Sequence, residues 1–168
     1  MSNTHARNVI ALIADSPTQR GLSLRDTITI AHPSGPTLSY TDTIAAQFAA
    51  LVAPADRIRY IDVEAFIARD ELTVSGTVKI LTDDLLIDGR FETENNVHTS
   101  PGVSATARRR SDITAVKVSG ASAPNSDTEP WPENVEVTVS GQNLNVVFPA
   151  RRNRGDLLGK LALGLLAK

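Results

Sequence analysis

The chain has 168 residues, of which 41% are apolar and 21% charged, so it has the composition of a globular protein that can bury one hydrophobic core. Its 17 Lys and Arg residues against 19 Asp and Glu give a formal net charge of −2, which disfavours a protein held on nucleic acid by phosphate neutralisation. The chain has no Cys, which excludes a disulfide framework, a thiolate nucleophile and a Cys-ligated zinc site.

The imidazoles are limited to His5, His32 and His98. The longest apolar run near the N-terminus, Val9–Ala14, is too short for the core of a signal peptide, and no stretch approaches the roughly 20 apolar residues that a membrane span needs. We therefore expect a cytoplasmic protein without a membrane span, a nucleic-acid partner, a metal or another cofactor.

The first 55 residues are predicted to be helical, with interruptions. After Thr4, which is suited to be an N-cap, apolar residues recur with a helical period until Ser16-Pro17, where proline ends the hydrogen-bond ladder. Residues 22–30 fit both a strand and a helical turn. A further helix begins at Thr41 or Asp42 and ends before Pro54. Its apolar face consists of Ile44, Ala45, Phe48, Leu51 and Val52.

From residue 56 onward the apolar residues alternate with polar ones, which is typical of strands with one wet face. Two such stretches cover residues 61–67 and 72–80. A third covers residues 85–92, after an acidic turn at 82–84, so the second and third strands are expected to form an antiparallel hairpin.

Residues 103–118 predict two short strands or one bent strand, with a slip in the alternation near Asp112 of the kind that a bulge produces. Residues 119–134 carry three prolines among Ser, Asp and Asn and predict a long loop. Residues 135–140 and 144–148 then predict a second hairpin, and Asp156 is expected to open a C-terminal helix over residues 156–167. The apolar stripe of that helix consists of Leu157, Leu158, Leu161, Ala162, Leu165 and Leu166.

Together these elements predict an α+β protein with about six or seven strands. We expect a strongly bent antiparallel sheet or partly open barrel that is capped by the C-terminal helix and preceded by two N-terminal helices. Residues 1–55 would form the helical extension and residues 56–168 the β domain.

Two segments resemble the pleckstrin-homology-like superfold, especially its GRAM and bacterial branches. They are the strand pair Val74–Ile87, which contains Leu-Thr-Asp-Asp-Leu-Leu-Ile, and the segment Arg110–Val118, which contains Asp-Ile-Thr-Ala-Val. With the hairpin and helix that follow, the similarity covers residues 57–168 and implies a bent barrel closed by a helix. Members that bind phosphoinositides use a basic loop between their first two strands, whereas the matching turn here has one basic residue, Arg69.

Positive charge gathers in the last third of the chain, where residues 101–168 carry 9 basic and 6 acidic side chains. If the arginines meet at the N-terminus of the final helix, they would form a site for phosphate, sulfate or an acidic lipid surface. The alternative is that Asp156 supplies the negative charge at this helix end and pairs with Arg152 or Arg154, so that the arginines are solvated surface. The arginines in question are Arg108, Arg110, Arg151, Arg152 and Arg154.

A catalytic alternative depends on Asp83, Asp84 and His98. With Asp88, the two aspartates form an acidic group that is also typical of a solvated hairpin turn, and His98 has no nucleophile motif beside it. A hydrolase would require these side chains to converge in a cleft.

Since the sequence has no Cys, His cluster, phosphate loop or nucleophile elbow, we expect a non-catalytic module that binds or scaffolds a protein partner, or that forms a homo-oligomer. The helices over residues 4–14 and 42–53 are the expected contact elements. Phe48 and Leu51 are the candidate contacts on the second of these, and Trp131 is a third candidate, with a lid over the core as its alternative role.

Overall fold

The computed structural model of the chain describes residues 3–33, 37–52, 57–94, 100–120, 135–150 and 165. The chain divides into two compact units, Met1–Arg108 and Arg109–Lys168. Each unit is built around its own antiparallel sheet.

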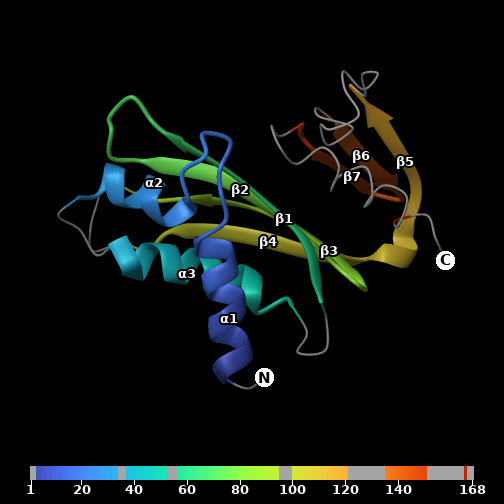
Figure 1. Cartoon of the computed structure of the whole chain (residues 1–168), viewed down its shortest axis with the longest axis horizontal. Helices are drawn as coiled ribbons and strands as arrows, with labels where there is room; N and C mark the ends of the chain where they lie inside the picture. The colour runs from blue at the N-terminus through green and yellow to red at the C-terminus, as the bar shows by residue number, and fades with distance from the viewer. Residues whose placement is uncertain are drawn as a thin grey trace, which may run out of the picture. The chain divides into compact units, whose positions relative to one another are not determined.

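The first unit consists of three helices followed by a four-stranded sheet, here called the first sheet (Figure 1). The strands are adjacent in chain order, β1-β2-β3-β4. The helices lie on one face of the first sheet. The elements are α1 (Asn3–Ala14), α2 (Leu24–Ala31), α3 (Thr37–Ala49), β1 (Ile58–Ile67), β2 (Val74–Thr82), β3 (Leu85–Glu92) and β4 (Gly102–Arg109).

The helices cover this face because apolar and polar side chains alternate along the strands, which places the apolar ones on one face of the sheet. Val63 on β1 lies opposite Val78 on β2, and both are fully buried in one cluster with Ile28 of α2 and Phe48 of α3. Burial of such a side chain contributes about 1.5–3 kcal/mol, so the cluster fixes which face of each strand turns inward. Strands β2 and β3 pair antiparallel as a hairpin, so the expected hairpin is confirmed.

Two glycines let aromatic rings approach the backbone of the first sheet. A Cβ on Gly76 would lie 2.6 Å from the ring of Phe91, and a Cβ on Gly89 would lie 2.7 Å from the ring of Phe48. Each ring therefore occupies space that any other residue at these positions would fill.

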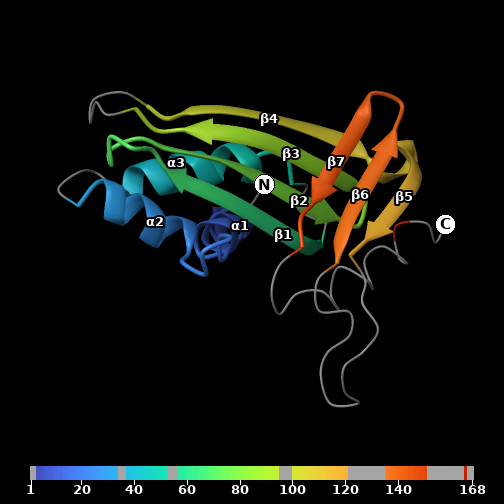
Figure 2. The ribbon, with the colours of Figure 1, turned by 90° about the horizontal axis from the view of Figure 1, so that it is seen from above.

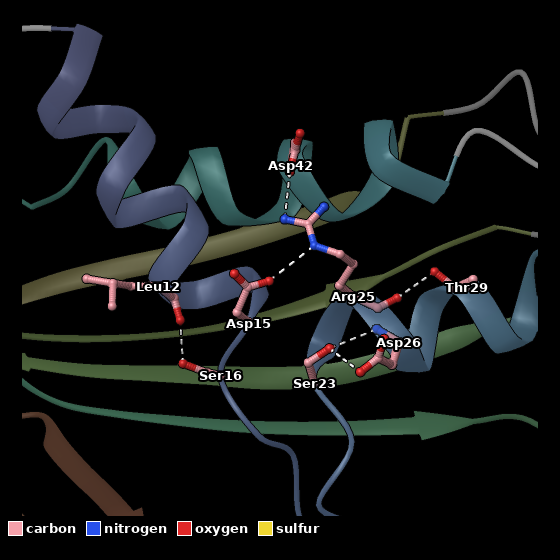
Figure 3. A network of polar contacts seen from close by, with 8 residues as sticks. All are labelled: Leu12, Asp15, Ser16, Ser23, Arg25, Asp26, Thr29 and Asp42. Atoms are coloured by element: carbon pink, nitrogen blue, oxygen red, sulfur yellow. Dashed lines mark hydrogen bonds and ion pairs between the residues drawn. The ribbon is translucent and has the colours of Figure 1, made fainter.

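The ambiguous residues 22–30 form a helix, α2, because Ser23 caps it. The Ser23 hydroxyl accepts a hydrogen bond from the backbone N–H of Asp26 at 3.0 Å and donates one to the Asp26 carboxylate at 2.7 Å. Arg25 then ties the helices together: its guanidinium lies 3.2 Å from Asp15 at the end of α1 and 3.7 Å from Asp42 of α3 (Figure 3).

The second unit holds the second sheet, with strands in the order β5-β6-β7. They are β5 (Ile113–Ser119), β6 (Glu136–Gly141) and β7 (Leu144–Phe148), and a 3-10 turn, η1 (Arg110–Asp112), precedes them. Val139 of β6 faces Val146 of β7, and both are buried, so the second predicted hairpin is also confirmed.

The expected single bent sheet or partly open barrel is wrong, because the strands form two separate sheets. The slip in the alternation near Asp112 marks the boundary between the sheets, where η1 ends β4 and β5 begins, rather than a bulge inside one strand. The expected cap by a C-terminal helix is also wrong. Three N-terminal helices, not two, cover the apolar face of the first sheet, and the described elements end with β7. Apart from the buried Leu165, the helix expected over residues 156–167 lies outside the described residues.

Other boundaries differ by a few residues. Helix α3 begins at Thr37, before the expected Thr41 or Asp42, and α1 begins at Asn3. In the part of the chain that the structure describes, no helix has the length and apolar character to cross a membrane.

Candidate functional site

The face of the first sheet that points away from the helices carries most of its charged side chains, and we call it the polar face. Its cross-strand partners fall into three rows across β1, β2 and β3. The rows are Asp62–Lys79–Asp88, Glu64–Thr77–Arg90 and Phe66–Ser75–Glu92.

Lys79 is the central cation of this face. Its ammonium nitrogen lies 3.9 Å from a carboxylate oxygen of Asp62 and 3.9 Å from one of Glu64. Asp62 is fully buried and the Lys79 side chain is 12% exposed, so water screens this cluster little. Thr77 adds a hydrogen bond from its hydroxyl to Glu64 at 3.2 Å. Through these contacts, the carboxylates of Asp62 and Glu64 on β1 point toward β2.

Asp88 continues the same row on β3. Burial raises the pKa of the Asp88 carboxyl above its ordinary value, and the positive charges of Lys79, Arg108 and Arg90 oppose that shift. Asp88 is therefore a carboxyl whose ionisation depends on the cations beside it.

A hollow of about 610 Å³ opens on the polar face beyond this row. Side chains from every strand of the first sheet line it, and Figure 2 shows these strands side by side. Phe66 is 49% exposed and Arg90 is also exposed, whereas the hydroxyls of Ser75, Thr77 and Ser104 supply hydrogen-bonding groups. The hollow thus combines an aromatic ring, a guanidinium and several hydroxyls.

A second titratable group, His32, lies at the end of α2 and is buried. Its Nε2 is 3.2 Å from the hydroxyl of Thr93, and that hydroxyl accepts a hydrogen bond from the backbone N–H of Val74 at 2.9 Å. The ring of Tyr40 packs edge-on against the imidazole at 5.3 Å. Burial lowers the pKa of His32, an effect that the negative charge of Asp70 opposes.

Of the five arginines expected to bind an anion, the structure describes two. Arg108 lies half-buried at the end of β4, where its charge acts on Asp88, and Arg110 begins η1. Arg151, Arg152 and Arg154 lie outside the described residues. The anion site stays a prediction.

Of the three residues expected to contact a partner, the structure describes Phe48 and Leu51. Phe48 is fully buried over Gly89, and Leu51 is partly buried against the same core. Trp131 lies outside the described residues. The described contact candidates thus have packing roles in the first unit.

The acidic residues of the catalytic alternative occupy the β2–β3 turn. The Asp83 carboxylate accepts a hydrogen bond from Arg59, and Asp84 is exposed. Asp88 lies on β3, and His98 is outside the described residues. Within the described ranges, no three His, Asp or Glu side chains form a group that could hold a metal ion.

Phe66 and Arg90 are not among the site residues that the sequence predicts. A usable signal was present, because strict alternation places both residues on the polar side of their strands. Their shared hollow depends on the register of three strands, which the sequence pattern alone does not give.

Comparisons with protein-family models, with curated proteins and with solved structures find no match for this chain. The resemblance to the pleckstrin-homology-like superfold therefore stays a prediction.

Proposed function

We propose that this chain is a non-catalytic protein-binding module whose partner binds in the hollow on the polar face of the first sheet. The observation that carries the proposal is the pairing of a half-exposed Phe66 with an exposed Arg90 in one concave surface. Aromatic residues and Arg dominate the binding energy of protein interfaces, because they combine a large contact area with directed hydrogen bonds.

The surroundings of the two residues fit this role. The exposed Arg90 and Glu92 supply polar groups to the hollow, and the neighbouring row Asp62–Lys79–Asp88 is fixed because Lys79 is held between carboxylates. The hydroxyls of Thr77 and Ser104 lie in the hollow beside Arg90 and can exchange hydrogen bonds with a partner's backbone. An apolar anchor with a polar rim is the usual anatomy of a protein interface.

The proposal is tested by placing a photo-crosslinking amino acid at position 66 of the full chain and identifying the proteins joined to it. Excess unlabelled wild-type chain should abolish the crosslink. In a binding assay with the purified partner, Phe66→Ala and Arg90→Ala should each weaken binding at least tenfold, because each removes a central contact.

Leu12→Ala is the matched control, since Leu12 is 54% exposed on α1 and lies outside the hollow. It should leave the affinity unchanged. Equal affinity for wild type, Phe66→Ala and Arg90→Ala, with all three proteins folded, would show that the hollow is not the binding surface.

A further inference from the structure

We infer that two copies of this chain associate through strand β4, which pairs antiparallel with β4 of the second copy and joins their first sheets into one. This inference does not depend on the proposed function. It starts from the two edge strands of the first sheet, β1 and β4, of which β1 is hydrogen-bonded at its outer side by Gln19.

The β1 edge is covered by its own chain at Ala65. The side chain of Gln19 donates a hydrogen bond to the carbonyl oxygen of Ala65 at 2.6 Å and accepts one from its N–H at 3.0 Å. In the described part of the chain, β4 is the other end of the strand order, and Figure 2 shows it as the outer strand of its unit. Its eight residues form an edge of the kind that pairs with another strand.

The polar face gives the register of this pairing. Gly102 lies beside Glu92 of β3, since a Cβ on Gly102 would be 3.9 Å from the Glu92 carbonyl oxygen. Arg108 lies at the opposite end of β4, and its charge acts on Asp88, which shares the polar face with Glu92. Thus β4 carries a cation at one end and has an anion beside its other end.

Antiparallel pairing centred on Ala105 places Arg108 opposite Gly102 of the second copy. Because Gly102 has no side chain, Arg108 can reach over it to the neighbouring Glu92 of that copy, about 10 Å away across two strand spacings. Symmetry repeats the ion pair at the other end of the interface. The second copy would then contribute Arg108 to the wall of the hollow that Gly102 and Glu92 line.

The charges allow a reciprocal test by analytical ultracentrifugation of the full chain. Wild type should show a concentration-dependent monomer–dimer equilibrium. Glu92→Arg and Arg108→Glu should each raise the dimer dissociation constant at least tenfold, and the double variant should return to within about threefold of wild type, because the ion pair is rebuilt with its charges exchanged. Arg109→Glu makes the same charge change one residue further along β4 and should have little effect.

The chain has no Cys, so introduced cysteines test the register directly. Ser104→Cys mixed with Thr106→Cys should form a disulfide-linked dimer on mild oxidation, because these opposed residues would form a non-hydrogen-bonded pair, whose side chains lie closest. Ser104→Cys alone should not. A wild-type chain that is monomeric at every concentration would overturn the inference. So would a dimer whose dissociation constant does not respond to the charge exchange and that gives no crosslink between Ser104→Cys and Thr106→Cys, including a dimer formed through another surface. Phe66→Ala should leave the dimer intact, which separates this inference from the proposed function.

Discussion

Gln19 pairs with Ala65 as a neighbouring strand would, because its side-chain amide supplies one donor and one acceptor to the backbone of β1. The loop that carries Gln19 is held by a bridge between Pro17 and Ser23 and by a 2.7 Å hydrogen bond from the N–H of Thr18 to the carbonyl oxygen of Leu22. The loop between α1 and α2 thus supplies a strand-like neighbour to β1 at Ala65.

Replacing Gln19 should therefore destabilise the first unit. Gln19→Leu leaves the buried Ala65 backbone without these two bonds, and we expect the free energy of unfolding to fall by about 1–3 kcal/mol in urea titration. Gln47→Leu, at an exposed position of α3, is the matched control and should cost less than about 0.5 kcal/mol. Equal losses in the two variants would contradict the strand-like role of Gln19.

The contrast between Gln19 and the hairpins shows what the sequence can predict. The hairpins between β2 and β3 and between β6 and β7 follow from local alternation and short turns. Gln19 and Ala65 lie 46 residues apart, and no periodicity links them. Helix α2 was ambiguous for another reason. Its eight residues are too few to distinguish a helical period from the alternation of a strand, and the Ser23 cap favours the helix.

The same distinction applies to the candidate site. Phe48 has the sequence pattern of a helix face and was expected to contact a partner, whereas the space for its ring comes from Gly89 on a distant strand. Phe66 and Arg90 are polar-face residues by alternation, but their proximity depends on the register of β1, β2 and β3. The face of a residue can be predicted locally, and its neighbours on adjacent strands cannot.

Gly89 should not tolerate a side chain. In Gly89→Ala the new Cβ would lie 2.7 Å from the Phe48 ring and 2.8 Å from the Cα of Ala105, so backbone as well as side chain must shift. We expect a loss of about 1–3 kcal/mol, measured by urea unfolding. Gly102→Ala is the matched control, because the nearest atom to its Cβ is 3.9 Å away. A loss for Gly102→Ala as large as that for Gly89→Ala would contradict this account.

Asp88→Asn should stabilise the protein at neutral pH. The folded state raises the pKa of Asp88, so it holds the proton more tightly than the unfolded state, and the ionised carboxyl opposes folding once the pH exceeds the folded pKa. We expect a gain of less than about 1 kcal/mol at pH 7, because a half-buried carboxyl keeps part of its hydration. The gain should vanish near pH 3, where both states are protonated.

Asp84→Asn, at an exposed position of the β2–β3 turn, is the control for the Asp88 substitution and should change the free energy of unfolding by less than about 0.5 kcal/mol. Chemical unfolding at pH 7 and pH 3 measures both variants. A lower stability of Asp88→Asn at pH 7 would mean that the attraction of Lys79, Arg108 and Arg90 outweighs the cost of burial.

His32 should make stability fall on acidification. Its pKa in the folded state lies below the ordinary value of 6.5, so between these two values the unfolded state binds more protons than the folded state. The free energy of unfolding should therefore decrease as the pH falls below about 6.5, and this loss should level off below the folded pKa. An NMR titration of the His32 ring should give a midpoint below 6.5. In His32→Gln, which cannot titrate, the same acid range should produce a smaller loss of stability. A ring that titrates at or above 6.5, or an unchanged pH dependence in His32→Gln, would show that burial against Thr93 and Tyr40 does not hold the imidazole neutral.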